Sequence, residues 1–272
     1  MAVDARLIEA DANKHNSTPK EDWDATHIDP ADAPRAVHEY LDTLDEAAFG
    51  AATEMQPKFT LHSDPASQWT AARKGPTFFS YSDNYLIDTD HGVILDVEPT
   101  RSIRQAEVGS TKTMLTRVKD KFGLVPDWMI ADTAYGSGPM LGWLVERKID
   151  PYIPVIDKSG RNNRTWTRAD FDWDAQNDLY ICPEGHALKQ FRRNYSDPNR
   201  GPTGKGTAKY RAMKLRKKVE MLFAHLKRIL GLGRVRLRGP CGANDEFLLA
   251  ATAQNLRKLA KIFPAPQQVR KA

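Results

Sequence analysis

The chain of 272 residues has few cysteines and no long apolar run. Cys182 and Cys241 are its only cysteines, too few for a disulfide framework or a four-thiolate zinc site. No stretch of 18 apolar residues occurs, which excludes a membrane-spanning helix. The first residues lack the apolar segment of a secretory signal. We therefore expect a soluble cytoplasmic protein with reduced thiols.

Acidic residues become scarce toward the C-terminus. Residues 1–100 hold 19 acids and 7 bases, whereas residues 101–272 hold 16 acids and 33 bases. Within 185–240, 16 Lys and Arg residues accompany only Asp197 and Glu220. Such a segment is either a solvated face or a polyanion-binding site, and its place partly on an amphipathic helix favours the second. Nucleic acid is the commonest such partner.

Apolar periodicity predicts a mixed α/β fold, in which strands and helices alternate. Strands are expected at 1–12, 81–88, 93–98, 128–132 and 152–156, and helices at 33–47, 103–122, 140–148, 207–230 and 243–262. The segment Thr89–Gly92 has the composition of a hairpin turn between the second and third of these strands.

The same pattern predicts a core interrupted twice. Residues 1–12, 76–157 and 207–262 would form the core. Residues 13–75 are expected to be an acidic insertion, with loops outside the helix at 33–47, and residues 158–206 a second, irregular and partly β insertion or linker. The tail 263–272 is expected to be disordered.

The helix predicted at 207–230 carries one acid beside a continuous apolar face. On a helical wheel Glu220 lies next to an apolar arc of about 120°, between Arg216 and Lys227. Such a glutamate either forms local ion pairs or reaches over a sheet edge to join other carboxylates, and the two bases could hold phosphates. The apolar arc consists of Leu215, Val219, Leu222, Phe223, Leu226, Ile229 and Leu230.

Two further acids follow or lie on predicted strands. Asp132 ends the apolar run WMIAD, at the strand edge where open α/β sheets place their chemistry, although an Asp there can equally cap a following helix. Asp4, with Asp11 as the alternate, lies on the first predicted strand. An acid near a chain terminus is usually solvated, so residue type alone leaves the role of Asp4 open.

Three stretches, VDARLIEADA, IADTAY and RKKVEMLFAHLKRILGL, resemble the DDE transposases of bacterial insertion sequences. The resemblance covers nearly all of the chain, including a Cys-Pro-x-Gly motif at 182–185. It implies an RNase H-like fold, a mixed sheet flanked by helices, with Asp4, Asp132 and Glu220 as the catalytic residues and metal ligands.

The family signature around the glutamate, Tyr-x2-Arg-x3-Glu-x6-Lys, is matched in register by Arg216, Glu220 and Lys227, while Met213 stands at the Tyr position. Two divalent cations, Mg²⁺ or Mn²⁺, are implied, and both suit carboxylate ligands. The implied function is DNA cleavage and strand transfer for cut-and-paste movement of an insertion sequence. The basic residues expected at the DNA backbone are Arg216, Lys217, Lys227, Arg228, Arg234, Arg236 and Arg238.

The resemblance also implies partners and a location: double-stranded DNA as transposon ends and target, a homodimer, no membrane, and the bacterial nucleoid. Two departures predict an N-terminally truncated and internally shortened chain with weak or no transposition. Only three residues precede Asp4, where the family has a DNA-binding region, and 194–213 is short. A catalytically inactive DNA-binding remnant and a structure-directed nuclease therefore stay open as alternatives.

Overall fold

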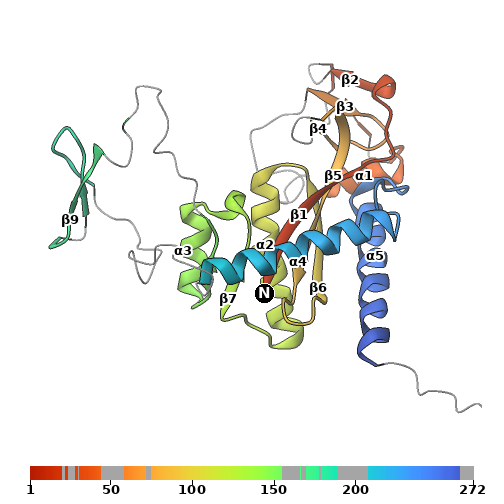
Figure 1. Ribbon diagram of the computed structural model, residues 1–272. Helices are drawn as coiled ribbons and strands as arrows, with labels where there is room; N and C mark the ends of the chain where they lie inside the picture. Colours follow the sequence, from red (N-terminus) through yellow and green to blue (C-terminus); the bar gives the residue numbers. More distant parts are fainter. Residues whose placement is uncertain are drawn as a thin grey trace, which may run out of the picture. The chain divides into compact units, whose positions relative to one another are not determined.

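The computed structural model describes residues 1–19, 22–23, 28–29, 31–43, 58–71, 75–154, 166, 170–177, 179–188 and 208–263. The chain divides into two compact units (Figure 1). The first consists of Met1–Pro126 and Met213–Ala272, and the second of Asp127–Ala212.

An antiparallel sheet organises the first unit. Its central strand β5 (Thr77–Ile87) pairs along its length with β1 (Ala2–Glu9), from Ile87 opposite Ala2 to Ser80 opposite Glu9. On its other side β5 pairs with β6 (Ile94–Arg101) and, near its start, with β4 (Gln68–Ala71). The β5–β6 connection turns through Gly92 at φ 68°, which confirms the predicted hairpin.

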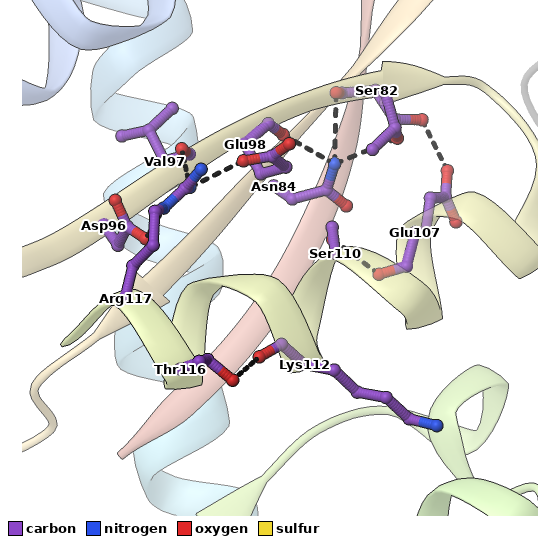
Figure 2. Close-up of polar contacts among 11 residues, drawn as sticks. Ser82, Asn84, Asp96, Val97, Glu98, Glu107, Ser110, Lys112, Thr116 and Arg117 are labelled. Atoms are coloured by element: carbon purple, nitrogen blue, oxygen red, sulfur yellow. Dashed lines mark hydrogen bonds and ion pairs between the residues drawn. The ribbon is translucent and has the colours of Figure 1, made fainter. Parts of the chain in front are cut away.

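Helix α2 (Arg104–Phe122) covers one face of this sheet (Figure 2). The Arg117 side chain lies 2.8 Å from Asp96 and 2.6 Å from Glu98, two β6 residues on the same face. Nearer the start of the helix, the Ser82 hydroxyl donates to Glu107 at 2.5 Å. The helix ends at Gly123, whose φ of 67° is left-handed, as its sequence predicted.

Helices α4 (Ala208–Arg228) and α5 (Gly239–Ile262) pack on the opposite face. The apolar face predicted for α4 is largely confirmed, because Val219, Leu222, Phe223 and Leu226 are buried, although Ile229 is 58% exposed. Helix α5 contacts β6 and, near its own start, α1 (Arg35–Asp42).

The second unit begins with β7 (Trp128–Ile130), the 3-10 turn η4 (Thr133–Tyr135), α3 (Gly138–Glu146) and β8 (Asp150–Tyr152). Strands β7 and β8 are parallel, so the chain combines antiparallel and parallel pairing and the predicted mixed α/β class is confirmed. A three-stranded antiparallel sheet follows, which agrees with the β content predicted there: β9 (Asp172–Asp174), β10 (Leu179–Ile181) and β11 (Ala187–Leu188).

The prediction of loops within 13–75, outside one helix, was wrong. The segment contains the 3-10 turn η1 (Lys14–Asn16) and the strand pair β2 (Ser17–Pro19) and β3 (Phe59–Leu61), and β4 joins the main sheet. These strands are too short to show a period, and aromatic packing supports them: Trp69 lies 4.9 Å from Phe79 between ring centroids.

The predicted tail, apart from Phe263, lies outside the described residues. None of the described helices is long and apolar enough to cross a bilayer.

A buried carboxylate joins the start of α5 to the segment before β4. Asp64 is fully buried, and its Oδ1 accepts hydrogen bonds from the Tyr81 hydroxyl and from the Gly239 amide at 3.2 Å. Burial raises the Asp64 pKa to about 6, although Tyr81, Gly239 and the Arg238 charge oppose the shift. The folded protein therefore holds a proton here that the unfolded chain releases near its ordinary pKa of 3.8.

We expect Asp64→Asn to remove one component of the pH dependence of stability. The raised pKa contributes stability that is fully present below 3.8 and is lost as pH rises through about 6, an amount of about 3 kcal/mol. Asn retains an oxygen for Tyr81 and Gly239. Urea unfolding of both proteins from about pH 4 to 7 measures the difference, and parallel stability curves would contradict the prediction.

Candidate active site

Asp4 lies on the sheet face that α4 covers. The Arg6 guanidinium lies 5.6 Å from the centroid of the Phe223 ring, so the even-numbered side chains of β1 face this helix. Tyr85, directly opposite Asp4 in the β1–β5 register, stacks on Phe223 with ring centroids 5.3 Å apart. Strand alternation therefore directs the Asp4 carboxylate toward the α4 side.

Contacts along α4 show which way the helix runs over β1 (Figure 1). The Lys227 ammonium donates to the Leu7 carbonyl at 3.0 Å. One helical turn earlier, Phe223 contacts Arg6 and also Tyr85, which lies opposite Asp4 on β5. Moving toward the start of α4 thus moves toward the start of β1. Glu220 lies nearly one turn earlier still, in the direction of Asp4.

Both carboxylates keep contact with solvent. Asp4 is half-buried, and its Oδ1 accepts a hydrogen bond from the Ala5 amide at 3.0 Å. The Glu220 side chain is 50% exposed, and its Oε1 lies 3.9 Å from Arg216 Nε, a long contact. The local ion pair between Glu220 and Arg216, one of the two alternatives for this glutamate, is therefore present but weak, because exposed ion pairs contribute little to folding stability.

Asp132 belongs to the second unit and follows β7. Its Oδ1 accepts a hydrogen bond from the Ala134 amide at 2.7 Å and caps η4. Asp132 therefore does cap the turn that follows it, as one of the two sequence interpretations allowed, and this cap uses its Oδ1. Asp11, the alternate for Asp4, instead pairs with Arg234 at 3.1 Å and Arg238 at 3.0 Å.

The side-chain type of each predicted ligand suits a hard divalent cation. Asp4, Asp132 and Glu220 offer only carboxylate oxygens, which Mg²⁺ and Mn²⁺ prefer. Of His, Cys, Asp and Glu, no three in the described part of the chain lie close enough together to hold a metal ion.

The predicted DNA-contacting bases fall into two groups in the first unit. Lys217, Arg228 and Arg236 are exposed, and Arg216 is 41% exposed at the side chain. Arg234 and Arg238 are occupied by Asp11, and Lys227 by the Leu7 carbonyl. The first group is available to phosphate, whereas the second group contributes to internal contacts.

Sequence reasoning missed one carboxylate on this face. Asp83 lies opposite Arg6 in the β1–β5 register and is fully buried between Tyr81 and Tyr85. Burial raises its pKa well above the ordinary value. The alternation in the run YSDNYLID could have indicated an acid on the same face as the two tyrosines, because alternate strand residues share a face.

A family model described as a transposase DDE domain matches residues 38–256, well over half of the chain. The match includes Asp132 and Glu220, whereas Asp4 precedes it. Neither the curated proteins nor the solved structures contain a match.

Proposed function

The chain belongs to the family of DDE transposases, and we propose that it catalyses metal-dependent DNA cleavage and strand transfer for cut-and-paste movement of an insertion sequence. Its RNase H-like, mixed α/β class agrees with this family. The observation that supports the proposal is the direction of α4 over β1: Glu220 precedes Phe223 along the helix as Asp4 precedes Arg6 along the strand.

In this proposal Asp4, Asp132 and Glu220 would be the ligands of two Mg²⁺ or Mn²⁺ ions. The ions would activate the attacking oxygen and stabilise the leaving one. Cleavage adds water at phosphorus, breaks the bond to the 3′ oxygen and leaves a 3′-hydroxyl. In strand transfer that hydroxyl attacks a target phosphodiester, so one bond forms as another breaks. The Ala134 amide, which donates to Asp132 Oδ1 at 2.7 Å, would orient this carboxylate.

Double-stranded DNA, as element ends and target, is the proposed partner. Arg216, Lys217, Arg228 and Arg236 would contact its backbone, which gives affinity and register without reading sequence. A homodimer would supply one catalytic site to each of the two ends, and the bacterial nucleoid would be its place of action.

The test is an assay with the ends of the parent element and a supercoiled target plasmid. We expect nicking at the ends and then joined product, both dependent on Mg²⁺ or Mn²⁺. Nicking without joining would support the structure-directed nuclease instead. Binding without nicking, in either metal, would support the inactive remnant.

DNA binding is expected to be mostly electrostatic, with little sequence selectivity. Arg216→Ala should lower the slope of log K against log salt by about one, because one phosphate contact is lost. Fluorescence anisotropy at several salt concentrations measures the slope. Lys119→Ala, at an exposed position of α2 on the other face of the sheet, is the matched control. Salt-insensitive binding, or strong preference for one sequence, would contradict the prediction.

A further inference from the structure

Helix α5 has two apolar faces, and only one of them is buried. Phe247, Ala250 and Ala251 pack against the first unit and are at most 8% exposed. The outer face of a solvated helix is normally polar, so an apolar outer face indicates a further partner. Five large apolar side chains of α5 and its C-terminal cap are 43–73% exposed: Leu248, Leu249, Leu256, Leu259 and Phe263.

The exposed residues follow the spacing of an interface between two helices. Leu249, Leu256 and Phe263 are seven residues apart, and the exposed Thr252 and Leu259 lie between them, at alternate steps of three and four residues. This spacing places all five in one stripe, opposite the buried face, and is the pattern by which side chains of two helices interlock. We call these five residues the outer stripe.

Charges beside the outer stripe favour an antiparallel partner. Glu246 and Arg257 lie on the same flank of the stripe, three turns apart. The amides of Arg236 and Leu237 donate to Glu246 Oε1 at 2.5 and 2.6 Å and hold this charge at the flank. Two identical antiparallel helices bring this flank against its own copy, with Glu246 of one helix near Arg257 of the other. Parallel helices would bring it against the opposite flank, which carries no charge at the corresponding positions.

A groove beside the outer stripe extends the apolar surface onto the sheet. The Asn255 side chain accepts from the Ile94 amide at 2.9 Å and donates to the Ile94 carbonyl at 2.8 Å, so these β6 groups are not free to pair with an added strand. The surface therefore suits a helix better than a strand. The groove has a volume of about 240 Å³, and its lining includes Leu95, Val97, Val118, Phe122, Leu248 and Thr252.

We propose that two copies of this chain associate through the outer stripe, with α5 of one copy packed antiparallel on α5 of the other. Leu249 of each copy lies against Leu259 of the other, and Thr252 against Leu256. This two-fold arrangement aligns the stripes from end to end and so buries the most apolar surface. The stripe is only about 20 Å long, so we expect a dissociation constant in the micromolar range, as for other small interfaces.

The inference names a surface for the homodimer of the proposed function, but it requires neither metal nor catalysis. The test is sedimentation velocity of the full chain without DNA or metal, at increasing protein concentration. Wild type should pass from monomer to dimer. Leu249→Glu and Leu256→Glu should each weaken association at least about tenfold, because each places a charge in an apolar interface.

Met221→Glu is the matched control, because it makes the same kind of change at a 72% exposed apolar residue of α4. It should associate as wild type does. Thermal melts by circular dichroism check that all three variants are folded. A wild-type chain that stays monomeric, or folded leucine variants that associate as wild type does, would overturn the proposal.

Cysteine cross-linking tests the direction of the two helices. In a Cys182→Ser, Cys241→Ser background, a mixture of Leu249→Cys and Leu259→Cys chains should form a disulfide-linked dimer under mild oxidation. Leu249→Cys alone should not, because its two copies would lie about 15 Å apart along the helices, too far for a disulfide. Rapid cross-linking of Leu249→Cys alone would show a parallel pair, and the proposed arrangement would be wrong.

Glu220→Gln distinguishes failure of this inference from failure of the proposed function. It removes a proposed metal ligand on another helix, so it should form dimers as wild type does. A monomeric wild-type chain that cleaves and joins DNA refutes the α5 dimer alone. A wild-type dimer that is lost in Leu249→Glu, but cleaves DNA in neither metal, refutes the proposed catalysis and leaves the dimer standing.

Discussion

Glu220→Gln is expected to lower metal-dependent DNA cleavage at least about 100-fold, because even residues that only orient metal ligands cost 10- to 100-fold when lost. The side chain is half exposed and its contact with Arg216 is long, 3.9 Å, so the amide should fit without disturbing the fold. What it removes is the negative charge that a hard cation requires. Cleavage of end-bearing DNA in Mg²⁺ and in Mn²⁺ measures the loss.

Asp120→Asn is the matched control, since it neutralises an exposed acid of α2 on the opposite face of the sheet. It should cleave at the wild-type rate. Asp4→Asn and Asp132→Asn should lose activity as Glu220→Gln does. Wild-type cleavage by Glu220→Gln, with an unchanged thermal melt, would show that this glutamate is not a metal ligand.

The long elements could be predicted because each has its own period or its own terminating residue. Helix α2 begins and ends within a residue of its predicted bounds, and Gly123 stops it. The strands of 13–75 could not be predicted, since three or four residues carry no period and their pairing partners lie elsewhere in the chain. Strand β1, predicted within 1–12, pairs with β5 from Ala2 onward, with Ala2 and Val3 both buried.

The candidate site was predictable in part for the same reason. Glu220 was found because the apolar arc of its helix is local in sequence. The pairing of Asp11 with Arg234 and Arg238 was not, because it joins segments more than 220 residues apart. The burial of Asp83 opposite Arg6 depends on the β1–β5 register, and the contact of Lys227 with the Leu7 carbonyl depends on the place where α4 crosses β1. Such contacts follow from tertiary structure and leave no mark in a local pattern.

Phe223→Ala is expected to destabilise the protein by about 3–5 kcal/mol, the usual cost of removing a buried aromatic side chain. Phe223 is 2% exposed, stacks on Tyr85 at 5.3 Å and lies under the Arg6 guanidinium at 5.6 Å. Its loss leaves a cavity between α4 and the sheet. Urea unfolding measures the cost, and Phe223→Leu, which fills most of the volume, should cost less.

Met221→Ala is the control on the same helix, because Met221 is 72% exposed and its truncation should change stability by less than about 0.5 kcal/mol. Equal stabilities for the two alanine variants would mean that α4 does not pack on β1 through Phe223. The inference that Glu220 lies on the Asp4 side of Phe223 would then lose its support. It depends on the order in which two α4 residues contact β1: Phe223 contacts Arg6, and Lys227 contacts Leu7. A large cost at Phe223 with none at Met221 instead fixes which side of α4 meets the sheet, and Glu220 lies at the edge of that side.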